Sequence, residues 1–222
     1  STKDPIAKYK NVSLPINELK INFDFFSLIK NKPHISKTRM SFNELKFSEI
    51  KKLIVGAKPS NFKRFVLNNV SEGSIKGFVN FNFSENLKLI DYKINTNLKK
   101  LKLKIFKDVE IENANFNLIA DSSLILINSI SFNLEGIPVT NGLVNIERKN
   151  GFLVEGSLNT KLTSDTEKLS NFFSLFSDSE FLNKKIEISG NLLNQFKLNF
   201  DPTLKLKKYE YNLTGDMNES KI

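Results

Sequence analysis

The chain has 222 residues, no cysteine and a formal net charge of +9, and 40% of its residues are hydrophobic. This length accommodates one large β domain or two smaller ones with a substantial core. The absence of cysteine excludes disulfide bonds and thiolate metal sites, and no apolar run approaches the ~20 residues that a membrane-spanning helix needs. The positive charge allows nucleic acid or anionic lipid as a partner, but an AT-rich genome would give the same abundance of Lys, Asn, Ile and Phe.

The chain begins at Ser1 without a methionine and shows no signal peptide. We therefore expect it to be a piece of a longer protein, with any membrane anchor outside it. No linker divides the sequence, so we expect one sheet domain over residues 1–222. Its expected parts are a helical entry over 47–70, a main meander over 73–163, a helical insert over 164–182 and closing strands over 185–214.

The first part of the chain is predicted to form short strands. Val12–Ile16 is one of them, and Leu19–Phe25 is another, because its apolar and polar residues alternate. A turn over residues 31–33 leads to a third strand, Ile35–Phe42.

The hydrophobic period then changes to that of two short helices. The apolar residues of Phe47–Val55 allow one helix, which the following glycine and proline would end. Ser60 can cap a second helix that runs to Asn69. Glu72–Gly73 is expected to end this helix and lead into a strand.

Gly73–Phe83 is the clearest alternating stretch. Its odd-numbered positions are apolar or glycine, and its even-numbered positions are polar except for Phe78. Successive strand side chains point to opposite faces, so this segment predicts a strand with one apolar and one polar face. The pattern recurs along the chain with turn signals about every ten to twelve residues, which is typical of all-β folds.

Further strands are expected over residues 87–95, 100–105, 113–120, 124–134, 143–148, 152–162, 186–192, 196–200, 204–206 and 209–213. In the strand over 124–134, one apolar face is assigned to alternate residues on both sides of Asn128, namely Leu124, Leu126, Ile130, Phe132 and Leu134. Turns are predicted at Asn141–Gly142, at Asp201–Pro202 and at Asn150–Gly151, which is the strongest hairpin signal. Ser164 and Glu167 have the spacing of a capping box, which predicts the helical insert.

No pattern in the sequence is typical of an enzyme. His34 is the single histidine and lies in a predicted turn, where a solvated residue is favoured over a catalytic or metal-binding one. The sequence contains neither a phosphate-binding glycine loop nor a GxSxG nucleophile motif. We expect no catalytic residues, no cofactor and no metal.

Lys100, Lys102 and Lys104 form the best candidate for a nucleic-acid interface. Sheets that bind nucleic acid place aromatic side chains on the same face as the charge, for stacking on bases. Here the aromatic residues fall on the opposite face, so we expect the lysine row to be solvated exterior. Nucleic acid is not an expected partner, and a basic nucleic-acid-binding sheet remains the least favoured alternative.

The segment Lys58–Phe83, KPSNFKRFVLNNVSEGSIKGFVNFNF, resembles a pattern in bacterial AsmA-like proteins, in the branch that includes the YhdP-type members. There a proline precedes a short helix with a bulky aromatic residue, and a glycine then opens a long strand. Pro59, Phe65, Asn69 and Gly73 occupy the corresponding positions, with Phe65 where that helix commonly carries Trp. The rhythm of strands with glycine extends the similarity towards Phe200.

The resemblance implies a segment of an elongated, groove-shaped β protein of the Gram-negative envelope. Such proteins are anchored in the inner membrane, project across the periplasm and are implicated in moving phospholipid towards the outer membrane. Membrane contact would then occur through regions outside this chain, and neighbouring segments of the parent protein would be partners.

Together these observations predict a mainly β fold, a long antiparallel meander curled into a groove or taco-like open sheet, with two or three short helices. The expected function is a non-catalytic groove for phospholipid acyl chains, and the alternative is a structural or adhesive β module with a closed apolar core. The expected lipid-binding residues are Val79, Phe81, Phe83, Leu101, Leu103, Ile105, Phe116, Leu118, Leu126, Ile130, Phe132, Leu134, Phe152, Val154, Leu158, Ile186, Ile188, Leu192, Phe196 and Leu198.

Overall fold

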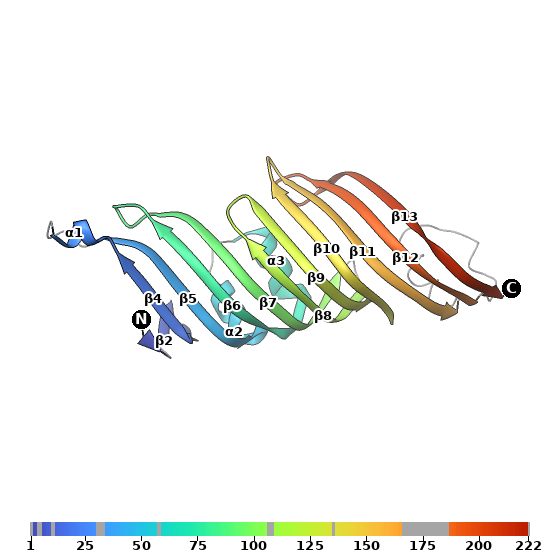
Figure 1. Ribbon diagram of the computed structural model, residues 1–222, viewed down its shortest axis with the longest axis horizontal. Helices are drawn as coiled ribbons and strands as arrows, with labels where there is room; N and C mark the ends of the chain where they lie inside the picture. Colours follow the sequence, from blue (N-terminus) through green and yellow to red (C-terminus); the bar gives the residue numbers. More distant parts are fainter. Residues whose placement is uncertain are drawn as a thin grey trace.

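The computed structural model describes residues 2–3, 6–9, 12–29, 34–56, 59–105, 109–134, 136–165 and 187–221. They form a mainly β structure, in which two of the three short helices lie against one side of a long antiparallel sheet (Figure 1). The predicted turn over 31–33, most of the predicted helical insert and Ile186 lie outside the described residues. The prediction that Ser164 begins the helical insert is wrong, because Ser164 lies in the strand Phe152–Asp165.

The main sheet is a meander of ten strands, to which a two-residue strand adds at one edge. Its order is β1-β4-β5-β6-β7-β8-β9-β10-β11-β12-β13, so from β4 onward each strand pairs with its neighbours in the chain. β1 and β13 lie at opposite ends of this order, and the sheet is therefore open. The bounds are β1 Thr2–Lys3, β4 Glu18–Phe23, β5 Ile35–Lys46, β6 Val70–Phe83, β7 Leu89–Ile105, β8 Val109–Ala120, β9 Leu124–Leu134, β10 Ile137–Arg148, β11 Phe152–Asp165, β12 Glu187–Phe200 and β13 Leu206–Lys221. A separate hairpin consists of β2 Ile6–Tyr9 and β3 Val12–Pro15.

Several strands are longer than the alternation predicts. The segments 87–95 and 100–105, predicted as two strands, are joined in the single strand β7, except that residues 87–88 precede it. The described parts of the predicted strands 186–192 and 196–200 are likewise joined in β12, and 204–206 and 209–213 in β13, which begins only at Leu206. The prediction divided them because the alternation is interrupted in the middle of the strand. In β7 the interruption is a β-bulge, which adds one residue without ending the ladder.

Bulges recur at corresponding places in neighbouring strands. Lys100 in β7, Asn113 in β8, Ser129 in β9 and Asn141 in β10 all have positive φ, between 50° and 53°, and the pairing register shifts beside each of them. An extra residue reverses which positions face a given side. The apolar residues shift by one position at the same places and so stay on one side of the sheet.

The helices follow local signals closely. α2 has the predicted bounds Phe47–Val55, and Ser60 caps α3, Asn61–Asn69, by accepting a hydrogen bond from the backbone N–H of Lys63 at 3.1 Å. The expectation that α3 ends at Glu72–Gly73 is wrong, because β6 begins at Val70 and contains both residues. The predicted strand Leu19–Phe25 is also too long at its end, since Asp24 accepts a hydrogen bond from the Phe26 N–H and the short helix α1, Phe25–Ile29, begins there.

Two of the three predicted turns that lie within the described residues are found in the structure, and one is not. Asn150–Gly151 forms the expected hairpin between β10 and β11, with φ of 45° and 134°. Asp201 begins the expected turn between β12 and β13, where its carbonyl accepts from Leu204 N–H at 2.9 Å. The turn at Asn141–Gly142 is wrong, because both residues lie within β10 at its bulge.

α2 and α3 form the main buried cluster together with residues of β6, β7 and β8. Phe47 and Val66 from the helices pack with Val70, Leu101 and Ala114 from β6, β7 and β8, and each of these side chains is at most 8% exposed. Lys63 Nζ also donates to the Val55 carbonyl and Lys51 Nζ to the Leu67 carbonyl, which ties the two helices together.

In each of two hairpins an aspartate carboxylate accepts hydrogen bonds from residues of the turn, which makes the stability of these hairpins pH-dependent. Asp121 accepts from the N–H groups of Ser123 and Leu124, and Asp201 from the hydroxyl and N–H of Thr203 and the N–H of Lys205. These bonds hold the pKa of both carboxyls below the usual range, chiefly through Thr203 Oγ1 for Asp201 and through Ser123 N–H for Asp121.

A carboxyl with a lowered folded pKa stabilises above its unfolded pKa, about 3.9, and loses that contribution as the pH falls through the folded value. We expect Asp201→Asn to lower the melting temperature at pH 6. The difference in melting temperature between the variant and the unmodified chain should become smaller as the pH falls below about 4. Thermal unfolding followed by circular dichroism between pH 6 and pH 2 measures this difference. A difference that stays constant over the pH range would contradict the stabilising role of the Asp201 carboxylate.

Candidate apolar binding face

The pairing register assigns side chains to two chemically different faces of the sheet. One row of directly paired residues crosses all ten strands of the meander, and every member is apolar or tyrosine: Leu19, Met40, Val79, Ile94, Ala120, Ile125, Ile146, Val154, Leu198 and Tyr209. We call the side of the sheet that carries this row the apolar face. The adjacent row, on the opposite polar face, is Glu18, Ser41, Phe78, Asn95, Ile119, Leu126, Asn145, Glu155, Lys197 and Glu210.

Most of the residues expected to line a lipid site share the apolar face. They are Val79, Phe81, Phe83, Leu101, Leu103, Ile105, Phe116, Leu118, Ile130, Phe132, Leu134, Phe152, Val154, Leu158, Leu192, Phe196 and Leu198. Ile188 lies in β12 opposite Ser164, and Ile186 is outside the described residues.

Leu126 is the exception, and its assignment to the same face as Ile130 is wrong. The same holds for Leu124, which pairs with Glu147 on the polar face. Leu126 pairs with Ile119 and Asn145 on the polar face, while its neighbours Ile125 and Ile127 lie on the apolar face. The bulge at Ser129 causes the difference, since the alternation changes parity there. The run Leu124–Ile127 is apolar throughout, so it gives no alternation from which the face could be read.

α2 and α3 cover the part of the apolar face that lies around Leu101. Leu101 is part of the buried cluster under α2 and α3, and Leu103, Phe116 and Phe132 pack against that cluster. Leu101 is therefore not available to a ligand while the helices stay in place, and the other three side chains, which are half-buried, are only partly available. Ile130, at 6% exposed, is also buried.

Towards the two edge strands of the meander, β4 and β13, the described residues leave side chains of the apolar face without such a cover. Tyr209, Tyr211 and Leu213 on β13 are 69%, 57% and 44% exposed, and Phe23 on β4 is 50% exposed. The chain has 15305 Å² of accessible surface, compared with about 10,000 Å² for a compact protein of this size. The sheet thus leaves apolar surface open that a closed core would bury.

Long-range contacts bridge across the apolar side. The Arg148 guanidinium, at the end of β10, donates to the Tyr92 hydroxyl of β7 at 3.0 Å. Asn61 Nδ2, at the start of α3, donates to the Thr203 carbonyl in the β12–β13 hairpin at 2.8 Å. Within the apolar face itself, Asn194 donates to Thr160 Oγ1 and accepts from the Tyr211 hydroxyl, so that these polar groups satisfy one another.

The polar face carries ion pairs between neighbouring strands. Lys102 contacts Glu112 at 2.9 Å and Glu110 at 3.2 Å, and hydrogen bonds to Glu112 and then Glu110 raise the pKa of this lysine. Lys197 pairs with Glu155 in the same way. Of the lysine row, Lys102 therefore carries its own counter-charges, which weakens the case for this residue as part of a nucleic-acid interface.

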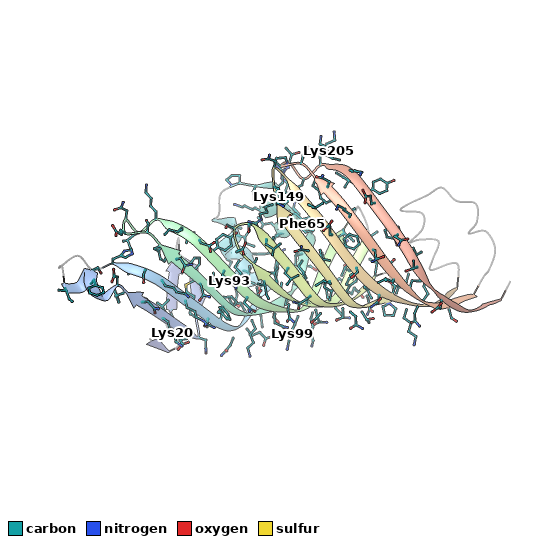
Figure 2. All side chains as sticks on the ribbon, turned by 45° about the horizontal axis from the view of Figure 1, so that its top comes forward. Lys20, Phe65, Lys93, Lys99, Lys149 and Lys205 are labelled. Carbon is teal, nitrogen blue, oxygen red and sulfur yellow. The ribbon has the colours of Figure 1, made fainter. Side chains whose placement is uncertain are left out.

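The lysines lie around the rim and the outer side of the sheet. Figure 2 shows Lys149 and Lys205 at the hairpins along the upper edge, and Lys20 and Lys99 along the lower side. Lys149 is paired with Glu147 at 2.7 Å. The polar face carries one aromatic residue in the row given above, Phe78, and the Arg39 guanidinium lies over its ring, 3.6 Å from the ring centroid.

Metal-binding groups are sparse among the described residues. No cluster of three or more His, Cys, Asp or Glu side chains among them could hold a metal ion. His34 lies just before β5, where its backbone N–H donates to Ser27 Oγ at 2.9 Å. None of the helices in this part of the chain has the length and hydropathy needed to cross a bilayer.

Residues missed from the sequence are mainly those whose parity a bulge conceals. Ile94 and Ile127 belong to the apolar face, and so do Val144 and Ile146 of β10. The signal that could have revealed them is a one-residue shift of the apolar pattern around the bulges at Lys100, Ser129 and Asn141. A search of protein-family models, curated proteins and solved structures finds no match to the chain.

Proposed function

We propose that the apolar face curls into a groove for phospholipid acyl chains and that the chain is a segment of an envelope-spanning lipid-transfer protein. The observation that carries this proposal is the unbroken row of apolar residues across ten strands, left open where α2 and α3 do not cover it. A sheet of this kind needs an apolar partner for its uncovered face.

The contact between α3 and the β12–β13 hairpin supports a curled sheet. The nine residues of α3 span about 14 Å, and β6, which follows α3, is six strands away from β12. A flat sheet would separate these strands by about 29 Å. The hydrogen bond from Asn61 to Thr203 therefore supports a sheet that bends towards its apolar face.

The mechanism would be solvation of the acyl chain outside a bilayer. Each methylene group kept out of water contributes about 0.8 kcal/mol, so a lined groove offsets much of the cost of leaving the membrane. The apolar rows repeat from strand to strand with similar side chains, which makes neighbouring positions nearly equivalent. Near-equivalent positions allow an acyl chain to slide without a deep trap.

The setting we propose is the periplasm of a Gram-negative bacterium, in a protein anchored in the inner membrane through regions outside this chain. The resemblance of Lys58–Phe83 to AsmA-like proteins supports this setting. The ion pairs of Lys102 and Lys197 on the polar face are consistent with a solvated exterior. Neighbouring segments of the parent protein would then continue the groove.

Lipid extraction and native mass spectrometry of the purified chain test the proposal. We expect the chain to retain phospholipid through purification at about one or more molecules per chain, because the uncovered face has no protein partner of its own. A well-folded monomer that carries no lipid and takes none from detergent micelles would contradict it. Salt-sensitive binding to single-stranded DNA instead would favour the nucleic-acid alternative.

A further inference from the structure

Arg148 occupies an unusual position for a charged residue. Outside the bulges, it is the one charged residue of β4–β13, in the part of the chain that the structure describes, whose register position falls on the apolar face. It pairs with Phe152, one step beyond the pair formed by Ile146 and Val154. Arg148 is exposed and ends β10 at the hairpin edge of the sheet.

The guanidinium is oriented but not neutralised. Its Nη1 donates to the Tyr92 hydroxyl at 3.0 Å, and Tyr92 pairs with Phe81 on the apolar face. No carboxylate among the described residues forms an ion pair with Arg148, and the neighbouring Glu147 is bonded to Lys149 instead. A positive charge thus stands, without a counter-ion from the described chain, at the open end of an apolar surface.

We infer that Arg148 binds the phosphate of a phospholipid headgroup while the acyl chains lie along the apolar face, an inference that rests on the proposed groove. The planar guanidinium fork matches two phosphate oxygens and stays charged at every physiological pH. The Tyr92 hydroxyl takes up one N–H and holds the remaining donors at the edge of the groove.

The apolar face continues from Arg148 over the length that an acyl chain needs. Along β10 it passes Ile146 and Val144 to Gly142, six residues and about 20 Å from Arg148. One leaflet of a bilayer core, half of ~30 Å, gives about 15 Å for an acyl chain. Beyond Gly142 the face is closed, because Val139 is only 4% exposed.

Along β10 the apolar face thus changes from exposed and charged at Arg148 to buried and apolar at Gly142. This change matches an amphiphile with an anionic head. The exposed, charged end is suited to a phosphate, and the buried, apolar end is suited to a terminal methyl group. A neutral lipid would fill the same apolar path but leave the guanidinium with the Tyr92 hydroxyl alone.

Two lipids with identical acyl chains test this assignment: dioleoyl phosphatidic acid, which has a phosphate, and dioleoylglycerol, which lacks one. The purified chain is equilibrated with each in mixed detergent micelles, and bound lipid per chain is measured by native mass spectrometry. We expect Arg148→Ala to lower phosphatidic acid loading about tenfold or more and to leave dioleoylglycerol loading unchanged. Arg148→Lys should recover part of the loss, and Arg39→Ala, on the polar face, should change neither.

The outcomes separate this inference from the proposed groove. If both lipids bind and Arg148→Ala affects both equally or neither, the headgroup site is overturned and the groove stands. If the unmodified chain binds neither lipid, both are overturned. Millimolar inorganic phosphate should not displace the phosphatidic acid, and full displacement would reassign Arg148 to free phosphate.

Discussion

Leu118→Asp should abolish phospholipid loading of the purified chain, whereas Ile119→Asp should leave it nearly unchanged. The two residues are neighbours in β8 and are both half-buried. Leu118 pairs with Thr96 and Ile127 on the apolar face, while Ile119 pairs with Asn95 and Leu126 on the polar face. A carboxylate has a large desolvation cost beside an acyl chain and almost none beside water, so loading should fall at least about tenfold for Leu118→Asp alone.

Comparison of the two variants separates an effect on binding from an effect on stability, because both changes put the same charge into the same strand. Lipid per chain is measured by extraction and mass spectrometry, and the melting temperature of each variant is measured in parallel. Equal losses of lipid from both variants, or a loss that follows the melting temperature, would show that the apolar face is not the binding surface.

Gly77→Ala should reduce the free energy of unfolding by about 3–5 kcal/mol, because its backbone and its surroundings both exclude a side chain. Gly77 has a φ of 151°, and an added Cβ would lie 2.2 Å from the Asn95 carbonyl oxygen and 2.7 Å from Thr96 Cα. Those are backbone atoms of the central strand β7, so relief requires moving the ladder itself. Chemical denaturation measures the effect.

Gly136→Ala is the matched control for this change. Gly136 also has a positive φ, 82°, but an added Cβ there meets no atom within 4 Å. Only the backbone strain remains, so the expected loss is about 1–2 kcal/mol. A Gly77→Ala variant no less stable than Gly136→Ala would mean that β6 and β7 are not packed as closely as described.

Local sequence signals predict this fold well where one residue decides the structure. Ser60 fixes the start of α3 and Asn150–Gly151 fixes a hairpin, because in each case a side chain or a backbone preference acts within three residues. Asn141–Gly142 carries a similar signal and yet lies inside β10. There the ladders to β9 and β11 on both sides hold the chain extended, and the left-handed residue is accommodated as a bulge.

The candidate binding face is only partly predictable for the same reason. Alternation assigns Leu118 and Val154 to the apolar face, since no bulge separates them from the pattern around them. It fails at Leu126, where the parity depends on the register with β8 and β10 rather than on β9 itself. Arg148 gives no sequence signal at all, because a charge at the end of a strand next to a turn is ordinary on either face.

The aligned bulges of β7 to β10 also restrict how the length of this chain can change over evolution. Loss of one residue at Ser129 would reverse the facing of every position on one side of it, and would move Ile130 and Phe132 from the apolar to the polar side. A compensating insertion elsewhere in the same strand would be needed to restore them. Single-residue insertions and deletions should therefore be confined to the hairpin tips, whereas whole hairpins, which preserve the parity of every strand, could be gained or lost.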